Sequence, residues 1–158
     1  MICDLHCHTT MSDGSLGIED VILQAKRMNI DFLSITDHDT LSRAKILGER
    51  YGVKMIQGVE MSAWDKERNR KVHIICYAPK KPDRLEGLCL KSCEIRKSCS
   101  KEMIEKVMQL YPITPESVLK HCTGSKSIYK SHIMRALIEY GYALEFYGEL
   151  DKKLFSVD

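Results

Sequence analysis

The sequence predicts an α/β fold in its first half and a mainly helical region after it. Between residues 1 and 60, stretches with strand-like alternation are separated by stretches in which apolar residues recur at helical spacing. This order favours parallel strands joined by right-handed crossovers, hence an α/β sheet or barrel. From residue 84 onward the apolar positions follow an almost entirely helical spacing. We therefore expect a β/α region over residues 1–78, a helical insertion over residues 79–150 and a polar tail over residues 151–158.

The β/α region opens with a strand. Its side chains alternate between two sets, with Ile2, Asp4, His6 and His8 on one side and Cys3, Leu5 and Cys7 on the other. The further expected elements are a helix over 18–28, a strand over 30–36, a helix over 41–51 that ends at Gly52, and strands over 53–60 and 72–77. The polar loop between the last two strands is too short for a helix. We therefore expect these two strands to pair antiparallel or to be near neighbours.

The helical region contains four expected helices, over 84–110, 115–121, 131–140 and 143–150. Thr114 is the expected N-cap of the second helix, and Pro115 occupies its first helical position. Gly141 is the expected stop of the third.

Size and composition exclude several classes of protein. A chain of 158 residues suits one domain, and a net charge of +2 gives no strong field for nucleic acid or membranes. No apolar run approaches the roughly 20 residues that a membrane span needs, and the N-terminus lacks the regions of a signal peptide. The seven cysteines are odd in number and lack a framework spacing. We interpret them as reduced thiols of a cytoplasmic protein.

The opening strand carries a pair of possible metal ligands. His6 and His8 point to the same face, roughly 6–7 Å apart, so both can hold one ion. Asp13 follows on a turn marked by its neighbours Ser12 and Gly14. Taken alone, two such histidines on an edge strand are more often incidental polar residues than ligands.

Later strands change this balance, because each brings another possible ligand to the same region. His38 comes just after the second strand, Glu60 ends the third, and His73 lies on the fourth. Chemistry gathers at the carboxyl ends of strands in such folds, so we expect one shared polynuclear site. Zinc, manganese and iron all accept this mixture of nitrogen and oxygen ligands. Two ions with Glu60 as the bridging carboxylate would clamp a phosphoryl group and activate a water.

Asp37 and Asp39 lie on either side of His38 in the sequence. On an extended strand their side chains point to the face opposite that of His38. We interpret Asp37 as a partner that orients an imidazole, and a solvated turn residue is the equally supported alternative. The same position makes Asp37 an expected catalytic residue.

The motifs occur in a fixed order over about sixty residues, and this order resembles a known family. They are His6-Cys-His8, Ser12-Asp13-Gly14, Ile35-Thr-Asp-His-Asp-Thr40 and Gly58-Val59-Glu60. They resemble the N-terminal half of the PHP (polymerase and histidinol phosphatase) superfamily. Residues 72–77 (VHIICY) and 131–138 (SHIMRALI) are similar to one branch of it. That branch holds stand-alone phosphoesterases acting on nucleoside 3′,5′-bisphosphates and short oligonucleotide 5′ ends.

The resemblance implies the N-terminal part of a distorted seven-stranded (β/α) barrel with two or three manganese, iron or zinc ions. It implies metal-ligand roles for His6, His8, Asp13, His38, Glu60, His73 and His132. It also makes Arg135 an expected catalytic and phosphate-binding residue, with Lys130 as the second basic candidate. From the residues alone, His132 is a surface histidine of a helix. The chain departs from the branch at Ser131, where proline is usual, and at Lys130, where Arg-Pro is common.

The family's later His-Pro segment and terminal Asp-x-His have no match in this sequence. We therefore expect an incomplete barrel whose open edge needs cover from a second copy, from a missing C-terminal half or from the chain's own helices. The ion held by His6 and His8 is expected to bind weakly, because the resemblance assigns it a further carboxylate. The position formed by Glu60, His73 and His132 is expected to keep its full ligand set.

The preferred function is hydrolysis of a phosphomonoester, on a nucleotide or an oligonucleotide end, by metal-activated water. The first alternative is a catalytically impaired PHP remnant that acts as a metal-binding or assembly module. A histidinol-phosphatase-like or polymerase-associated PHP module is the second alternative. An amidohydrolase that uses its metal ions in the same way is disfavoured, since the carbamylated lysine usual in that class has no clear counterpart in this sequence.

Overall fold

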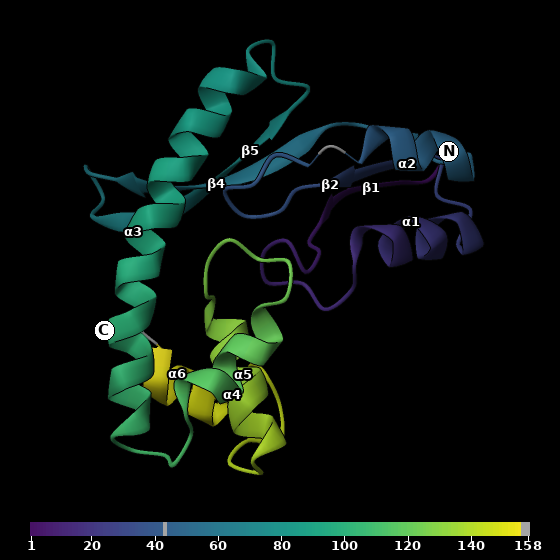
Figure 1. Cartoon of the computed structure of the whole chain (residues 1–158). Helices are drawn as coiled ribbons and strands as arrows, with labels where there is room; N and C mark the ends of the chain where they lie inside the picture. Colours follow the sequence, from purple (N-terminus) through teal and green to yellow (C-terminus); the bar gives the residue numbers. More distant parts are fainter. Residues whose placement is uncertain (43, 156–158) are drawn as a thin grey trace. The chain divides into compact units, whose positions relative to one another are not determined.

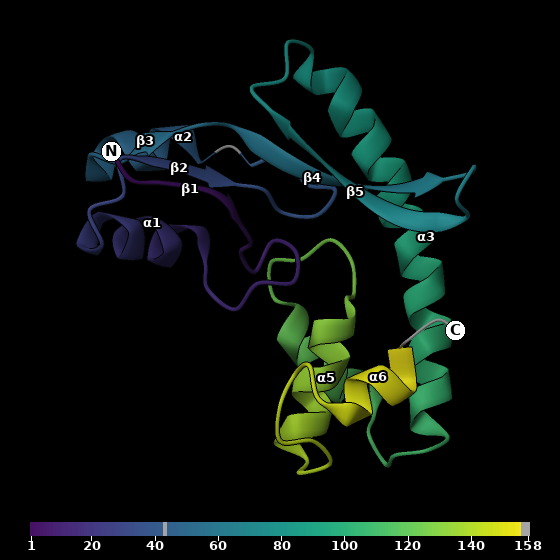
Figure 2. The ribbon, with the colours of Figure 1, turned by 180° about the vertical axis from the view of Figure 1, so that it is seen from behind.

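The computed structural model describes residues 1–42 and 44–155, and its contacts divide the chain into two compact units, Met1–Cys93 and Glu94–Asp158. Figures 1 and 2 show the ribbon from opposite sides. The elements are β1 (Cys3–Cys7), α1 (Ile18–Arg27), β2 (Phe32–Ile35), α2 (Lys45–Tyr51), β3 (Lys54–Met55), β4 (Gly58–Asp65), β5 (Arg70–Tyr77), α3 (Pro82–Met108), α4 (Pro115–Leu119), the short 3₁₀ turn η1 (Lys120–Cys122), α5 (Lys130–Glu139) and α6 (Glu149–Phe155). The predicted α/β class is confirmed. The expected boundary after residue 78 follows β5, whereas the contacts divide the chain within α3.

In the first unit, β1, β2 and β3 form a parallel sheet in that order. Helices α1 and α2 pack on one face of this sheet. The hydrophobic core between them contains Ile22, Ala25, Leu33, Ile35, Ala44 and Val53, with Cys7, Leu47 and Tyr51 packed against it. Because Cys7 points toward this core, its neighbours His6 and His8 point to the opposite face of β1. The helices therefore leave the histidine-bearing face uncovered.

The predicted third strand over residues 53–60 is two strands, because the chain changes its pairing partner. β3 pairs with β2, whereas β4 pairs with β5. Gly58 permits the change, since a Cβ atom there would lie 2.4 Å from the Ser34 hydroxyl oxygen. A parallel bridge between His38 and Glu60 keeps the start of β4 beside the segment that follows β2. This bridge brings two predicted ligands together.

The predicted antiparallel pairing of the last two strands is confirmed by the β4–β5 hairpin. One face of the hairpin packs on the first part of α3 (Figure 1). The residues of this small hydrophobic cluster are Leu41, Val59, Met61, Cys76, Leu85 and Cys89. Side chains alternate along each strand, so Glu60 and His73 belong to the other face.

The second unit is a helical cluster around its own core. The core residues are Ile104, Val107, Ile113, Val118, Ile133, Met134, Ala136, Leu137 and Phe155. The expected helices over 115–121 and 131–140 are confirmed to within one or two residues, although the first ends as η1. In the described part of the chain, no helix is both long and apolar enough to cross a membrane.

Two boundary predictions were wrong, both because of tertiary packing. Helix α2 begins at Lys45 and not at residue 41, since Leu41 is buried against the hairpin. The last helix covers Glu149–Phe155 and not 143–150, because Phe155 is buried in the core of the second unit. Arg43 and residues 156–158, which belong to the expected helix and tail, lie outside the described residues.

Thr114 caps α4 as predicted. Its hydroxyl oxygen accepts the backbone N–H of Ser117 (3.3 Å), and the Ser117 hydroxyl oxygen accepts the backbone N–H of Thr114 (3.2 Å). Substituting Thr114 by alanine is expected to lower the free energy of unfolding by about 1 kcal/mol, because one N–H at the helix start loses its partner. Urea denaturation measures this loss, and Thr123→Ala in an exposed turn is the control. Equal losses in the two variants would contradict the cap.

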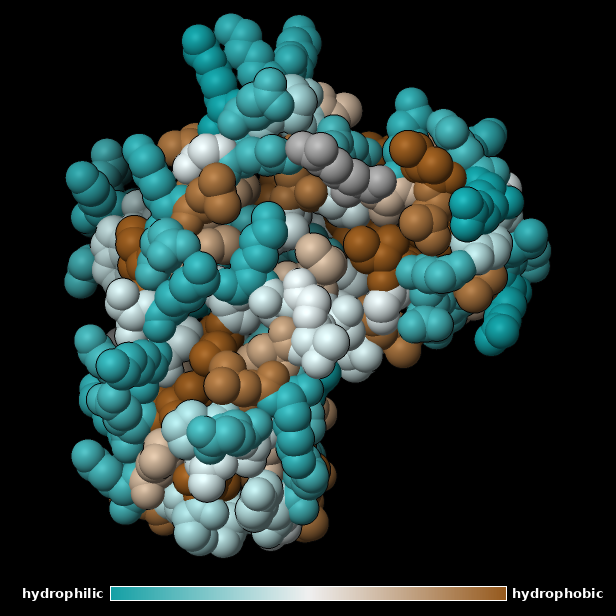
Figure 3. All heavy atoms as spheres, viewed as in Figure 1, coloured by the Kyte–Doolittle hydropathy of each residue, from teal (hydrophilic) through white to brown (hydrophobic). Residues whose placement is uncertain are grey.

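Hydrophobic side chains are also exposed at the surface, between hydrophilic ones, on the face drawn in Figure 3. The described chain exposes Trp64 and Ile74 of the hairpin by about half, 51% and 50% respectively. The strand alternation places these two side chains on opposite faces of the hairpin.

Candidate metal centre

Six of the seven expected metal ligands lie close together in the first unit. In the described part of the chain, three groups each bring one ligand atom per residue within 4.8 Å of one another. The groups are His6, His8 and Glu60; His8, Asp13 and His38; and His38, Glu60 and His73. His8, His38 and Glu60 each belong to two groups. The three groups therefore form one continuous cluster.

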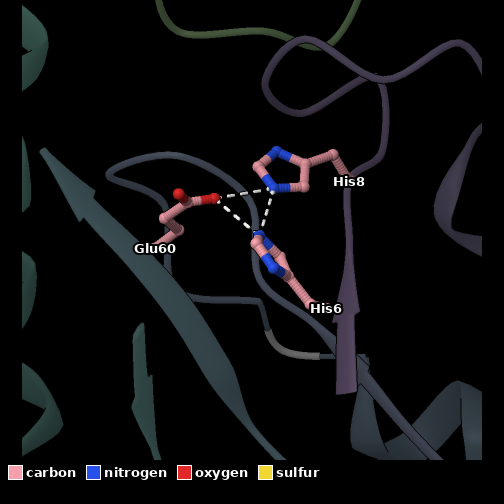
Figure 4. Close-up of side chains that lie close together, drawn as sticks. All are labelled: His6, His8 and Glu60. Atoms are coloured by element: carbon pink, nitrogen blue, oxygen red, sulfur yellow. Dashed lines mark hydrogen bonds and ion pairs between the residues drawn. The ribbon is translucent and has the colours of Figure 1, made fainter. Parts of the chain in front are cut away.

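The first group is the tightest (Figure 4). The Nε2 atoms of His6 and His8 lie 2.9 Å and 2.8 Å from Oε2 of Glu60 and 3.2 Å from each other. Strand β1 supplies the imidazole of His6, the residue directly after β1 supplies that of His8, and β4 supplies the carboxylate. Ligand atoms that share one metal ion at about 2.0–2.2 Å lie about 3 Å apart, as these do.

Asp13 sets the tautomer of His8. Burial alone would raise the pKa of Asp13, but the hydrogen bond from His8 and the nearby His38 lower it to about 2. An ionised carboxylate only accepts hydrogen bonds, so Nδ1 of His8 is the donor in its 2.9 Å contact with Oδ1 of Asp13. In the neutral imidazole, the lone pair is then on Nε2, which faces His6 and Glu60.

The electrostatics of His8 show that this position attracts a cation. Burial lowers the pKa of His8, but the hydrogen bond to Asp13 and the charges of Asp13 and Glu60 raise it above its usual value overall. A proton thus occupies Nε2 more readily than in a free imidazole. A divalent ion would satisfy the same converging lone pairs and carboxylate, and this donor set fits zinc, manganese or iron.

Metal affinity is expected to fall as the pH drops below neutrality. A ligand nitrogen must be deprotonated, so protons and metal compete for Nε2 of His8, and its raised pKa moves this competition to higher pH. Calorimetric titration with Mn²⁺ at about pH 8 and about pH 6 should show weakening of up to about tenfold per pH unit below that pKa. An affinity that is the same at both values would contradict this assignment.

Glu60 links all the imidazoles of the first unit's cluster. It is 5% exposed, and its Oε1 lies 2.6 Å from Nδ1 of His73 while its Oε2 faces His6 and His8. Burial would raise its pKa, but the hydrogen bond from His6 and the neighbouring His38 hold the pKa below the usual value. The two oxygens of one ionised carboxylate therefore point to two separate groups of imidazoles.

His38 completes the second and third groups. Its Nε2 lies 3.8 Å from Oδ2 of Asp13, and its Nδ1 lies 3.7 Å from Oε2 of Glu60. Burial lowers the pKa of His38 despite the opposing charge of Asp13. The neutral imidazole, which is the ligand form, is thus favoured at this position.

Asp37 anchors the loop that carries Asp13. Its carboxylate is fully buried and accepts the backbone N–H and the hydroxyl of Thr9, both at 2.7 Å, and the hydroxyl of Ser12 at 2.6 Å. The solvated-turn alternative for Asp37 is therefore wrong. Ser12 in turn lies 3.3 Å from Nδ1 of His8, so the carboxylate acts on an imidazole through a hydroxyl.

Asp39 anchors the other ligand-bearing segment. It has a left-handed backbone conformation (φ 49°), its N–H donates to the carbonyl of Glu60 (2.9 Å), and its carboxylate accepts the N–H of Ser62 (3.0 Å). Asp37 and Asp39, on either side of His38, thus hold two different segments in place: Asp37 holds the loop that carries Asp13, and Asp39 holds the strand that carries Glu60.

The hydroxyls of Thr9 and Ser12 are site residues that the sequence analysis did not single out. Serine and threonine in a turn often bind nearby backbone or side-chain groups, and this was the available signal. It did not identify Asp37 as the partner, because Asp37 lies 28 and 25 residues along the chain from Thr9 and Ser12.

Gly14 allows the loop to fold back onto β1. A Cβ atom there would lie 2.4 Å from the carbonyl oxygen of His8. Gly14→Ala is expected to weaken Mn²⁺ binding by at least about tenfold and to cost about 1–3 kcal/mol of stability, since backbone must move. Calorimetry and urea denaturation measure both effects. Gly87→Ala is the control, because a Cβ atom at this position in α3 meets nothing within 4 Å; an equal response of the two variants would contradict the close approach.

His132 lies in the second unit and is 1% exposed, so it is not the surface histidine that the residues alone suggest. Its Nδ1 accepts the backbone N–H of Tyr129 and lies 3.2 Å from Sγ of Cys122. Burial raises the pKa of the Cys122 thiol to about 11. Cys122 is therefore protonated at neutral pH.

The two expected phosphate-binding residues also belong to α5 in the second unit. The guanidinium of Arg135 lies over the ring of Phe146, 5.7 Å from its centroid. The ammonium of Lys130 donates to the carbonyl of Phe155 (2.7 Å).

Comparison with known proteins identifies the family to which this chain belongs. Residues 4–155 match the model of the PHP domain. The chain belongs to the PHP domain family. The chain is 39% identical over 160 residues to a phosphoribosyl 1,2-cyclic phosphate 1,2-diphosphodiesterase of Eggerthella lenta. The aligned region covers 98% of this chain and 61% of the relative.

Two further relatives agree with the PHP assignment. A 3′,5′-nucleoside bisphosphate phosphatase of Chromobacterium violaceum is 28% identical over 152 residues, which cover 87% of this chain and 50% of the relative. The crystal structure of a protein from Bifidobacterium adolescentis, described as a metal-dependent phosphoesterase, superposes on this chain with a TM-score of 0.87 at 26% identity. The superposed region covers 98% of this chain and 56% of the Bifidobacterium chain. The chain thus spans about half to three fifths of the length of these relatives.

Proposed function

We propose that this PHP chain carries the metal centre of a phosphoesterase that hydrolyses a phosphomonoester of a nucleotide or an oligonucleotide end. The observation that carries the proposal is the cluster of three overlapping ligand groups, two of which contain Glu60. Such a cluster has the donor chemistry for more than one divalent ion. The family's relatives named for phosphatase and phosphodiesterase activities support the reaction class.

In this proposal, His6, His8 and Glu60 hold one ion, His8, Asp13 and His38 offer ligands to a second position, and His38, Glu60 and His73 offer ligands to a third. Bound manganese, iron or zinc would supply an activated water and would offset the charge of the phosphoryl oxygens. The carboxylate of Glu60 spans two of these positions, since its oxygens face different imidazoles. Asp37 holds the loop of Asp13 in place through Ser12.

We also propose roles for three residues of the second unit. His132 is the further ligand of the position formed by Glu60 and His73, and Arg135 neutralises a substrate phosphate, with Lys130 as its neighbour in the motif. These assignments are supported by the similarity of residues 131–138 to the phosphoesterase branch of the family. A second copy, or the polypeptide that the longer relatives carry, would cover the open barrel edge. Seven free thiols in the described chain are compatible with a reducing cytoplasm.

Hydrolysis of a cyclic phosphodiester is the second candidate, favoured by the 39% identity to the cyclic phosphate diphosphodiesterase. A metal-binding or assembly module without turnover is the third. The assay that separates them uses the full chain loaded with Mn²⁺ and measures phosphate released from a nucleoside 3′,5′-bisphosphate. The cyclic phosphate of a ribose phosphate is tested in parallel.

The proposal predicts phosphate release from the bisphosphate that His8→Ala abolishes and His121→Ala leaves unchanged. His121 is a suitable control, because it lies in η1 and pairs with Glu139. Turnover of the cyclic substrate alone would favour the second candidate. Stable Mn²⁺ binding without turnover of either substrate would contradict the proposed enzyme.

A further inference from the structure

The β4–β5 hairpin extends the metal centre along one face. Its register pairs Glu60 with Ile75, Ser62 with His73 and Trp64 with Lys71. Directly paired residues lie on the same face of an antiparallel pair, as do residues two positions apart on one strand. The ligands Glu60 and His73 therefore share their face with Trp64 and Lys71.

The packing of the hairpin confirms which face this is. Val59, Met61 and Cys76 belong to the alternate set and pack against Leu85 and Cys89 of α3. Helix α3 therefore covers the opposite face, and the ligand-bearing face is the one that Trp64 shares.

Trp64 is placed to touch a molecule that is bound at the ligands. It is the single tryptophan of the chain, and 51% of it is exposed. It is the diagonal neighbour of His73, and such pairs lie about 7–8 Å apart between Cα atoms, which is within reach of an aromatic side chain. A large aromatic surface thus lies next to one of the two exposed ligands of the centre.

A positive charge stands opposite this indole. The hairpin turn carries several basic residues, but Arg68 and Arg70 are bound to Asp65 at 3.1 Å and 3.8 Å. The side chain of Lys71, by contrast, has no ion pair or hydrogen bond among the residues that the structure describes, and it is exposed. An aromatic face with an adjacent lysine is the combination that binds a nucleobase by stacking and its phosphate by charge.

We propose that Trp64 and Lys71 form a subsite for the base-bearing part of a nucleotide whose phosphate lies at the metal centre. This inference rests on the proposed function and narrows it, because base-free sugar phosphates would not use the subsite. Trp64 gains stacking contact with the base, and Lys71 adds a positive charge beside it. Trp64 is thus a specificity-determining residue of the centre.

The test measures binding, which needs no turnover. The Mn²⁺-loaded full chain is titrated by calorimetry with adenosine 5′-monophosphate and with ribose 5-phosphate. Trp64→Ala is expected to weaken binding of the adenosine nucleotide by roughly 5- to 150-fold, the effect of losing one stacked base, and to leave binding of ribose 5-phosphate within about twofold. Trp64→Phe should recover most of the loss. Fluorescence of the single tryptophan should be quenched by the nucleotide and not by ribose 5-phosphate.

Ile74→Ala is the matched control, since Ile74 is 50% exposed on the other face of the same hairpin. This variant should bind both ligands as the parent chain does. Equal changes for the two ligands in Trp64→Ala, or no change for the nucleotide, would overturn the subsite while leaving the proposed phosphoesterase intact. A chain that binds neither ligand and turns over no substrate would overturn the proposed function, and the subsite with it.

Discussion

Replacing Glu60 by glutamine is expected to abolish the metal centre while leaving the fold in place. Glutamine keeps the volume of this buried side chain but loses the charge and one acceptor oxygen that face four imidazoles. Because Glu60 belongs to two ligand groups, the loss in Mn²⁺ affinity should exceed the roughly 10- to 100-fold cost of losing an outer partner of a ligand. Calorimetric titration measures this loss.

The free energy of unfolding, measured with and without Mn²⁺, tests the Glu60→Gln variant independently of calorimetry. An ion that binds only the folded chain stabilises it by about 2.7 kcal/mol at a concentration of 100 times its Kd. The parent chain should show this gain with Mn²⁺, and the Glu60→Gln variant should show almost none. Glu67→Gln, in the exposed turn of the same hairpin, should behave like the parent. A Glu60→Gln variant that retains the full gain would contradict the assignment of Glu60 as a shared ligand.

Substituting Asp37 by alanine is expected to be the most destabilising change near the site. Three hydrogen bonds from Thr9 and Ser12 end on this fully buried carboxylate, and alanine would leave their donors unsatisfied. The expected loss in the free energy of unfolding is about 3–5 kcal/mol, measured by urea denaturation. Asp20→Ala, on the exposed side of α1, should change it by no more than about 0.5 kcal/mol.

Ser12→Ala separates two effects of the hydrogen bonds to Asp37: the positioning of the ligands His8 and Asp13, and the stability of the loop. It removes one of the three hydrogen bonds and should cost only about 1 kcal/mol, yet weaken Mn²⁺ binding about tenfold, because Ser12 is the link from Asp37 to His8 and Asp13. Ser15→Ala, at an exposed position in the same loop, is the control. Unchanged Mn²⁺ affinity in Ser12→Ala would show that Asp37 stabilises the loop without positioning the ligands.

Local patterns were sufficient to predict much of the fold and most of the cluster. The alternation from Asp4 to Cys7 in β1, the glycine stop at Gly52 after α2 and the Thr114 cap depend on neighbouring residues alone, and the structure contains each of them, although the pairing of β1 with β2 shifts register between Asp4 and Cys7. His38 and Glu60 were singled out because chemistry gathers at the carboxyl ends of strands, and His73 because it lies on the next expected strand; in the structure Glu60 lies near the start of β4 and His73 within β5. The structure brings these three together with His6, His8 and Asp13.

The features that local patterns missed depend on contacts between distant residues. The break between β3 and β4 follows from the close approach of Gly58 to Ser34, and the position of α6 follows from the burial of Phe155. The role of Asp37 depends on two hydroxyls more than 20 residues away. Such partners are set by the packed structure, so spacing along the chain did not reveal them.

The metal content of the purified chain tests the proposed centre most directly. After loading with Mn²⁺ and removal of free ion by gel filtration, elemental analysis gives the number of ions per chain. The overlapping ligand groups predict more than one bound Mn²⁺ per chain, with a clear loss in Glu60→Gln. Less than one ion per chain, unchanged by that substitution, would contradict a polynuclear centre at His6, His8, Asp13, His38, Glu60 and His73.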